Sequence, residues 1–166
     1  MAVTITLDKL KSIAEAEGLR YFLAPDRPAL LMSFSGQHGP HQVIMLVELD
    51  GRFLQFRTIG YGSCPASHPH LEAVLRVVGE LDYKFRLTKF GWDPSDGELA
   101  AYVDLWLEDA TLTQQQFGAM LRAFLPAIDQ SRARIQKTIE TGVDPDRIGG
   151  LPGGPVVPPV ASPPTV

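Results

Sequence analysis

Two apolar runs joined by Asp50-Gly51 place the strongest constraint on what this chain can fold into. The runs read HQVIMLVEL before the dipeptide and RFLQFRTIG after it. Asp-Gly accepts the positive φ angles of a tight turn, and between apolar segments it signals a β-hairpin closed by a two-residue turn. Polar and apolar side chains alternate only partly in the second run, so we expect both faces of the strand to be partly covered. The chain should therefore contain an antiparallel sheet.

Segments with the periodicity of helices lie before and after these strands in the sequence. A first helix is expected to begin after Thr6, which can cap it, and to end at Gly18. Two short apolar runs, LRYFLAP and PALLMSF, then predict further strands. A second helix should follow the hairpin, with Ser67 or His68 as its cap and Gly79 as its end.

A third helix has the clearest start signal in the sequence. Thr113 and Gln116 have the spacing of a capping box, in which the two side chains satisfy backbone N–H groups reciprocally. Pro126 lies inside the apolar stripe that follows, and proline removes a backbone donor and clashes with the preceding turn. We expect the helix to kink or restart there, with a second piece over about residues 127–141 in which Arg134 lies on a solvated face.

The segment GWDPSDGE at residues 91–98 groups acids around a glycine. A calcium loop that began at Asp93 would need glycine at its sixth position, and Gly97 falls at the fifth. Carboxylates this close in one loop do not indicate the cleft that acid–base catalysis requires. Apolar residues on both sides instead predict a hairpin, with Trp92 across from Glu98 and a turn between them.

This register assigns the faces of the second hairpin. Alternate residues of 83–87 and 103–107 would face the core, with Lys84 across from Trp106 and Arg86 across from Asp104 on the other side. The outward aromatic residues predict either a partner or dimer surface, or a surface that another helix or the tail covers. The candidate partner-binding residues are Tyr102, Trp106, Lys84 and Arg86.

Composition limits the class of protein. The formal charge of −4 comes from 15 basic and 19 acidic residues that are interspersed, which disfavours nucleic acid as a partner. The segment MAVTITLDKL has neither the basic start nor the apolar core of a signal peptide, and no apolar run reaches membrane-spanning length. We therefore expect a cytoplasmic protein that does not bind membranes. Cys64, the single cysteine, does not suggest redox chemistry. We expect one domain over residues 1–142 and a disordered Pro/Gly-rich tail over 143–166, whose prolines also suit polyproline II recognition.

A metal site is the alternative interpretation. Two loops at the same end of an antiparallel meander would carry imidazole and thiol groups that can bind zinc. The other reading is that these groups lie in solvated loops and in the first turn of a helix, because no pair has the spacing of a zinc motif. The residues concerned are His38, His41, Cys64, His68 and His70.

The second half of the sequence resembles the YbjN family of small bacterial proteins over about residues 67–130. Asp82 and Ala110 depart from the family pattern, where asparagine and glycine are usual. The residues that carry the resemblance are Leu81, Tyr83, Phe90, Gly91, Asp93, Asp96, Gly97, Asp104, Leu107, Glu108, Thr111, Leu112, Thr113 and Phe117.

The resemblance implies an α+β fold like that of type III secretion chaperones: a helix, antiparallel strands, a helix, a β-hairpin and a C-terminal helix. Those chaperones are usually dimers that hold a client protein, and members of the family have been labelled sensory transduction regulators. The spacing of residues in the sequence does not assemble the nucleophile, general base and orienting group of a catalytic site. We therefore expect no enzyme activity and no cofactor, but a chaperone-like or regulatory module that binds a client or partner protein as a homodimer.

Overall fold

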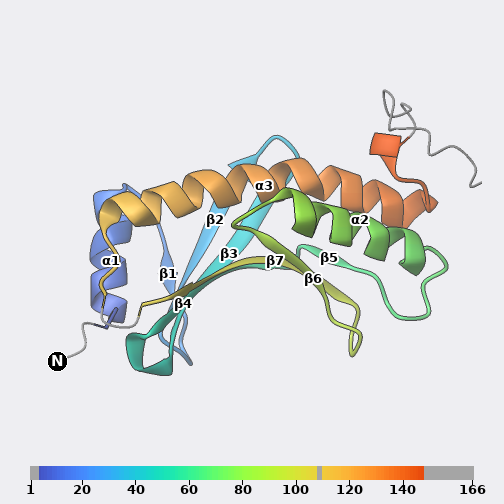
Figure 1. The fold of residues 1–166 in the computed structure, drawn as a ribbon. Coiled ribbons are helices and arrows are strands. Elements are labelled where there is room, and N and C mark those ends of the chain that lie inside the picture. Colours follow the sequence, from blue (N-terminus) through green and yellow to red (C-terminus); the bar gives the residue numbers. More distant parts are fainter. Residues whose placement is uncertain (1–3, 108–109, 148–166) are drawn as a thin grey trace, which may run out of the picture.

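Helices lie on one side of an antiparallel sheet in the computed structural model, which describes residues 4–107 and 110–147 (Figure 1). Strand order in the sheet is β1-β2-β3-β4-β7-β5, and β6 pairs with β7. The elements are α1 (Leu7–Ala16), β1 (Phe22–Leu23), β2 (Ala29–Gly36), β3 (Gly39–Glu48), β4 (Phe53–Ile59), β5 (Gly62–Ser63), α2 (Leu71–Lys84), β6 (Lys89–Trp92), β7 (Glu98–Trp106) and α3 (Gln114–Thr141). Short 3-10 turns cover Leu49–Gly51 and Pro145–Arg147.

The first hairpin forms as the sequence predicts, but its turn is longer. Glu48 is the last residue of β3 to pair, and it lies opposite Phe53. Between them Leu49, Asp50 and Gly51 all have positive φ angles, of 50°, 55° and 82°. The two-residue turn was therefore wrong, because the chain needs three consecutive left-handed residues to reverse here.

The first helix is confirmed in both its cap and its end. The Thr6 hydroxyl accepts a hydrogen bond of 3.1 Å from the Lys9 N–H, and Gly18 follows the helix with a φ of 70°. The side chains of Leu10, Ile13 and Ala14 are buried, so α1 closes one end of the sheet (Figure 1).

The second helix begins and ends later than predicted. His70 is its N-cap residue, without a side-chain hydrogen bond, and α2 continues past Gly79 to Lys84. Gly79 has no positive φ angle, so it is an ordinary helical residue and not a terminator. The sequence alone did not distinguish a helix-ending glycine from one inside a helix.

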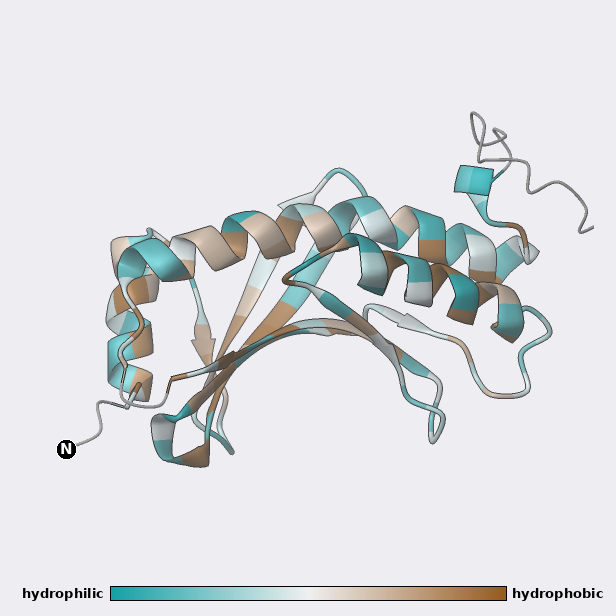
Figure 2. Ribbon diagram, in the orientation of Figure 1, coloured by the Kyte–Doolittle hydropathy of each residue, from teal (hydrophilic) through white to brown (hydrophobic). Residues whose placement is uncertain are grey.

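The third helix carries the predicted capping box, with both reciprocal bonds between Thr113 and Gln116. It is continuous from Gln114 to Thr141 with Pro126 inside it, so the prediction of two pieces was wrong. Pro126 is exposed, and water can therefore bind the Arg122 carbonyl that lacks a partner N–H. Figure 2 shows hydrophobic residues alternating with hydrophilic ones along α2 and α3, as expected for helices with one buried face.

The core lies between the sheet and these two helices. Phe56 of β4 makes an edge-to-face contact with Phe117 of α3, with ring centroids 5.4 Å apart, and a tilted contact with Phe124 at 6.4 Å. All three rings are fully buried. Rings of this size bury the largest apolar areas of any side chains, so this cluster fixes α3 on the sheet.

The second hairpin is confirmed, but its register differs by one residue from the predicted one. Trp92 pairs with Leu99, not with Glu98, and Lys89 pairs with Tyr102. A shift of one residue exchanges the two faces of a strand, so Phe90 points into the core and Lys89 points outward. Residues 83 and 84 belong to α2, and they do not pair with β7.

The end of the described chain packs on α2 and α3. The Arg134 guanidinium is only 10% exposed and bonds Asp144 and Glu80 at 2.6 Å each, which raises the pKa of this arginine, chiefly through the bond to Asp144. Arg134 is thus not on a solvated face. The predicted tail begins at residue 143, but residues 143–147 are ordered against the domain, and residues 148–166 lie outside the described part of the chain.

Candidate functional site

The face of the sheet that points away from α2 and α3 is the candidate site. None of the described helices covers it, and the sheet arches so that this side is concave (Figure 1). Register places alternate residues of each strand on it. We call this surface the outer face; its side chains include Leu31, Ile44, Leu46, Phe53, Gln55, Arg57, Ile59, Tyr102, Asp104 and Trp106.

An aromatic pair forms one corner of the outer face. Phe53 and Trp106 lie opposite each other in β4 and β7, and their rings pack edge to face with centroids 5.3 Å apart. The Trp106 side chain is 60% exposed. The expectation that Tyr102 and Trp106 face away from the core is therefore confirmed, whereas their role in binding a partner stays a prediction.

The middle of the outer face is polar. The Arg57 guanidinium bonds the Glu98 carboxylate at 2.6 Å, and the Asp104 carboxylate accepts hydrogen bonds from Gln55 at 2.7 Å and Lys89 at 3.1 Å. The Lys89 ammonium also lies 5.7 Å from the centre of the Tyr102 ring. Its bond to Asp104 raises the pKa of Lys89. These pairs hold side chains of neighbouring strands in fixed positions on the surface.

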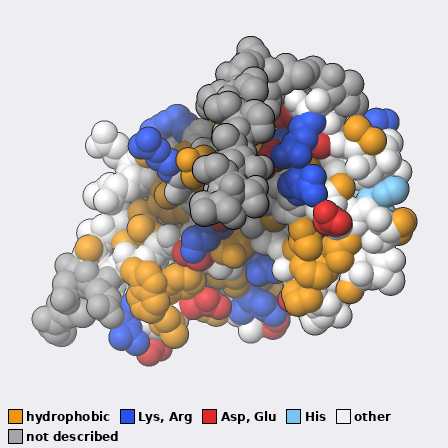
Figure 3. Space-filling model, turned by 45° about the vertical axis from the view of Figure 1, so that its right-hand side comes forward, with side chains coloured by type: hydrophobic (Ala, Val, Ile, Leu, Met, Phe, Trp, Pro, Cys, Tyr) orange, Lys and Arg blue, Asp and Glu red, His pale blue; other side chains and the backbone are white. Residues whose placement is uncertain are grey.

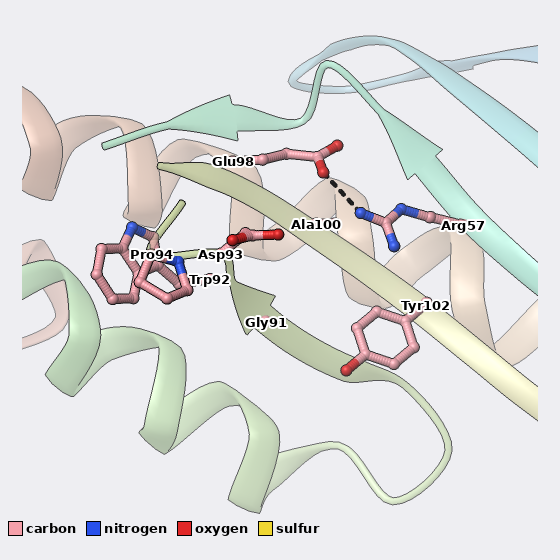
Figure 4. A pocket seen from close by; sticks show the side chains of 8 residues that line it. All are labelled: Arg57, Gly91, Trp92, Asp93, Pro94, Glu98, Ala100 and Tyr102. Carbon is pink, nitrogen blue, oxygen red and sulfur yellow. Dashed lines mark hydrogen bonds and ion pairs between the residues drawn. The ribbon is translucent and has the colours of Figure 1, made fainter. Parts of the chain in front are cut away.

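A hollow of about 280 Å3 opens beside this polar centre (Figure 4). Gly91 lies opposite Ala100 across β6 and β7, so two very small side chains form its floor. Arg57, Glu98, Tyr102 and the start of the acidic turn form its walls. A Cβ atom on Gly91 would lie 3.2 Å from Cε1 of Tyr102, which explains why glycine suits this position.

A second hollow of about 400 Å3 adjoins the first. It is lined by residues of β3 and β4 that include Ile44 and Leu46, and it shares Arg57 and Glu98 with the first hollow. The two hollows meet at the Arg57–Glu98 ion pair, which lines both, and we call the two together the trough. Apolar side chains line its β3 end, and Tyr102 lines its β6 end.

The acidic segment is a turn, as the sequence predicts. The Asp93 carboxylate accepts hydrogen bonds from the Ser95 N–H at 2.8 Å and from the Ser95 hydroxyl at 2.6 Å, and the Asp96 carboxylate accepts one from the Glu98 N–H at 2.8 Å. The bonds from Ser95 lower the pKa of Asp93. Both carboxylates thus stabilise the reversal of the chain, which Gly97 completes with a φ of 80°.

Lys84 and Arg86 do not join the outer face. Lys84 is the last residue of α2, and its ammonium lies over the Phe85 ring at 5.3 Å. Arg86 is exposed in the segment between α2 and β6. The cause is that α2 extends to Lys84 and β6 begins only at Lys89, so neither residue pairs with β7. Lys89 is the basic residue that bonds Asp104 instead. The alternation of residues 53–59 could have identified Phe53 and Arg57 as residues of the outer face. The hollow at Gly91 could not have been predicted, because it depends on the strand register, which the composition of the sequence does not reveal.

The histidine and cysteine residues of the alternative metal site do not converge. Among the described residues, no group of three His, Cys, Asp or Glu side chains is placed to hold a metal ion. Cys64 is buried, and burial raises the pKa of its thiol. His41 lies in β3, not in the loop as expected, and is only 3% exposed; its Nε2 is 2.8 Å from a carboxylate oxygen of Asp129. His68 and His70 lie side by side, with ring centroids 5.5 Å apart, but they form no such group with His41 or Cys64.

The fold places the chain in a class. The chain has the α+β fold of type III secretion chaperones, as expected: a helix, antiparallel strands, a second helix, a hairpin and a final helix. A chain of the HopA1–SchA chaperone–effector complex is similar with a TM-score of 0.52 and 11% identity, over 75% of this chain and 90% of that one. A chain of the ExsC–ExsE complex is similar with a TM-score of 0.51 and 18% identity, over 80% and 97%.

The chain belongs to the YbjN family, described as "Putative bacterial sensory transduction regulator", whose model matches residues 6–137. The crystal structure of YbjN from E. coli is similar with a TM-score of 0.60 and 15% identity, over 83% of this chain and 94% of that one. A search of curated proteins gave no match. Among the described helices, none combines the length and apolarity that crossing a bilayer requires.

Proposed function

We propose that this protein is a chaperone-like or regulatory module of the bacterial cytoplasm that binds a client or partner protein on its outer face and works as a homodimer. The observation that carries the proposal is an uncovered sheet face with exposed aromatic rings and a trough. One face of the sheet is buried against α2 and α3, whereas the outer face has no second layer of its own. Here a partner would supply that second layer.

The geometry of the outer face favours a folded occupant. Backbone groups in the middle of the sheet are already paired with neighbouring strands. A segment lying across the trough must therefore satisfy its own backbone N–H and C=O groups, which a helix does and an extended chain does not. We infer that the partner presents an amphipathic helix, with apolar side chains over Ile44 and Leu46 and against the Phe53–Trp106 pair.

The trough is better suited to binding than to catalysis. Its described lining contains no serine, cysteine or histidine, and the carboxylates of Asp93 and Glu98 accept hydrogen bonds from Ser95 and Arg57. Figure 3 shows hydrophobic side chains in separate patches among charged ones on the side of the molecule that it presents. The outer face likewise combines exposed aromatic rings with charged pairs, a mixture that interfaces between separately folded proteins also have. The complexes of the two chaperone-fold neighbours support a protein partner as well.

Quantitative crosslinked capture from bacterial lysate tests this proposal. Trp106→Ser should remove a reproducible set of captured proteins, because a tryptophan that an interface buries often supplies much of the binding energy. Leu23→Ser is the matched control, since Leu23 is an exposed apolar residue that does not line the trough. Capture that is unchanged by Trp106→Ser, or lost equally in the control, would contradict the proposal.

A further inference from the structure

A small hollow lies against α3 where β3 and β4 part. Gln42 and Ile59 form the last pair between these two strands, and Gly60 then turns the chain away with a φ of 60°. The start of β3, the end of β4, Gly60, Tyr61 and, from α3, Arg132 line the hollow. Its volume is about 200 Å3, below the roughly 300 Å3 at which sites for drug-sized ligands begin. Any occupant must therefore be small.

His41 lines this hollow, and one nitrogen of its ring has no partner. The side chain is only 3% exposed, and its Nε2 lies 2.8 Å from the Asp129 carboxylate. Its Nδ1 is buried without a hydrogen bond to any described residue. Within the described part of the chain, the Ser131 hydroxyl is the only other buried side-chain group in this condition. Buried polar atoms nearly always have a hydrogen-bond partner, so the free nitrogen indicates a place for an occupant.

Contacts of the His41 ring indicate the direction of this nitrogen. Nε2 and the Asp129 carboxylate lie on the β2 side, because a Cβ on Gly36 would be 2.9 Å from Nε2 and 2.0 Å from the carboxylate. The two nitrogens of an imidazole diverge, so Nδ1 is directed away from β2. The other neighbour of β3 is β4, whose end lines the hollow. A carboxylate on one ring nitrogen fixes the ring and leaves the second nitrogen for a ligand.

The charge around the hollow determines which ligand fits. Arg132 donates a hydrogen bond of 2.5 Å to the Pro40 carbonyl, and among the described residues no carboxylate pairs with its guanidinium. None of the described lining residues is acidic, and the Asp129 carboxylate is already bonded to His41 and to two backbone N–H groups. A guanidinium presents N–H donors in a planar fork that matches the oxygens of a carboxylate or phosphate. The hollow therefore favours an anion over a metal cation.

We propose that this hollow binds a small oxyanion, a carboxylate or a phosphate group, between the Arg132 guanidinium and the Nδ1–H of His41. The imidazole binds it in its protonated form, in which Nε2–H donates to Asp129. The Asp129 carboxylate then balances the charge of the ring, and Arg132 balances that of the ligand. The site adjoins the trough through Thr58 and Ile59, which line both, but it does not rest on the proposed function.

An NMR titration of the wild-type protein at pH 6, where an ordinary imidazole is mostly protonated, tests the site. Sodium phosphate and sodium acetate are the probes, each compared with sodium chloride at equal ionic strength. We expect both oxyanions to give saturable shifts of backbone amides, confined to residues 41–42, 58–61 and the turn of α3 at Arg132. Saturation by either one supports the site, and the tighter one identifies the preferred group. Shifts that do not saturate, or that chloride reproduces, would overturn it.

Calorimetry on two variants completes the test. Arg132→Gln should weaken binding at least about tenfold, because it removes both the charge and the fork. Arg86→Gln is the matched control, since it removes the same charge from an exposed arginine outside the hollow. Equal weakening in both variants would show only a general attraction of anions and would overturn the site. The wild-type shifts decide the question even if Arg132→Gln does not fold, and none of these results depends on partner capture.

Discussion

Asp129 fastens the β2–β3 turn to α3, and its charge should govern stability in acid. Its carboxylate accepts hydrogen bonds from the N–H groups of Gln37 at 2.9 Å and His38 at 3.0 Å, and it contacts His41 at 2.8 Å. A Cβ on Gly36 would lie 2.0 Å from this carboxylate, so glycine is needed for the close approach. The bond to His41, aided by the two backbone bonds, lowers the pKa of Asp129 from 3.8 to about 2.

The lowered pKa translates into stability that depends on pH. Because the folded state holds the carboxylate ionised, its contribution is fully present above the unfolded pKa and is lost as pH falls through the folded pKa. The shift corresponds to about 2 kcal/mol of unfolding free energy. Asp129→Asn should lose this amount near neutral pH, and its deficit relative to wild type should shrink between about pH 4 and pH 2.

Urea denaturation at a series of pH values measures this difference. Asp8→Asn is a control, since its carboxylate is exposed and pairs only with Lys11 on the surface; it should change stability by no more than about 1 kcal/mol. If the gap between wild type and Asp129→Asn is the same at both ends of the pH range, the charge of Asp129 is not what fastens the turn.

Three further substitutions test the fold. Pro126→Ala should raise the free energy of unfolding by about 1 to 3 kcal/mol, because it restores an N–H to a helix that is already continuous; a fall in melting temperature would show that the proline is needed. Arg134→Met should destabilise the domain by about 3 kcal/mol, since it removes the largely buried guanidinium that bonds Asp144 and Glu80 and leaves both carboxylates to the more exposed Arg147, and an unchanged urea midpoint would contradict that. Gly97→Ala should destabilise by at least about 1 kcal/mol, because Gly97 has a φ of 80° and a Cβ there would lie 2.7 Å from the Cys64 carbonyl oxygen; equal thermal stability would refute the strain.

Local signals in the sequence predicted much of the fold. The capping box at Thr113 and the hairpins at Asp50-Gly51 and at residues 93–97 depend on residues close together in the chain, and all three form. The outward direction of Tyr102 and Trp106 followed from alternation within one strand. These features need no information about distant contacts.

Other features depend on tertiary contacts that the sequence does not display. Packing of Val77 and Leu81 against the core carries α2 past Gly79, although glycine often ends helices. The bond from Asp93 N–H to the Glu98 carbonyl, at 2.8 Å, closes the second hairpin one residue away from the predicted register. This shift of one residue turns Lys89 onto the outer face. Lys84 and Arg86 are absent from that face for another reason, because α2 extends to Lys84 and β6 begins only at Lys89.

Site-specific photocrosslinking tests the central claim, that the outer face binds the partner. A photoreactive phenylalanine analogue would replace Phe53 on the outer face, or Ala133 on α3 as the control. The account predicts adducts with a different protein from position 53 and none from position 133. Partner adducts that form from position 133 but not from position 53 would contradict it.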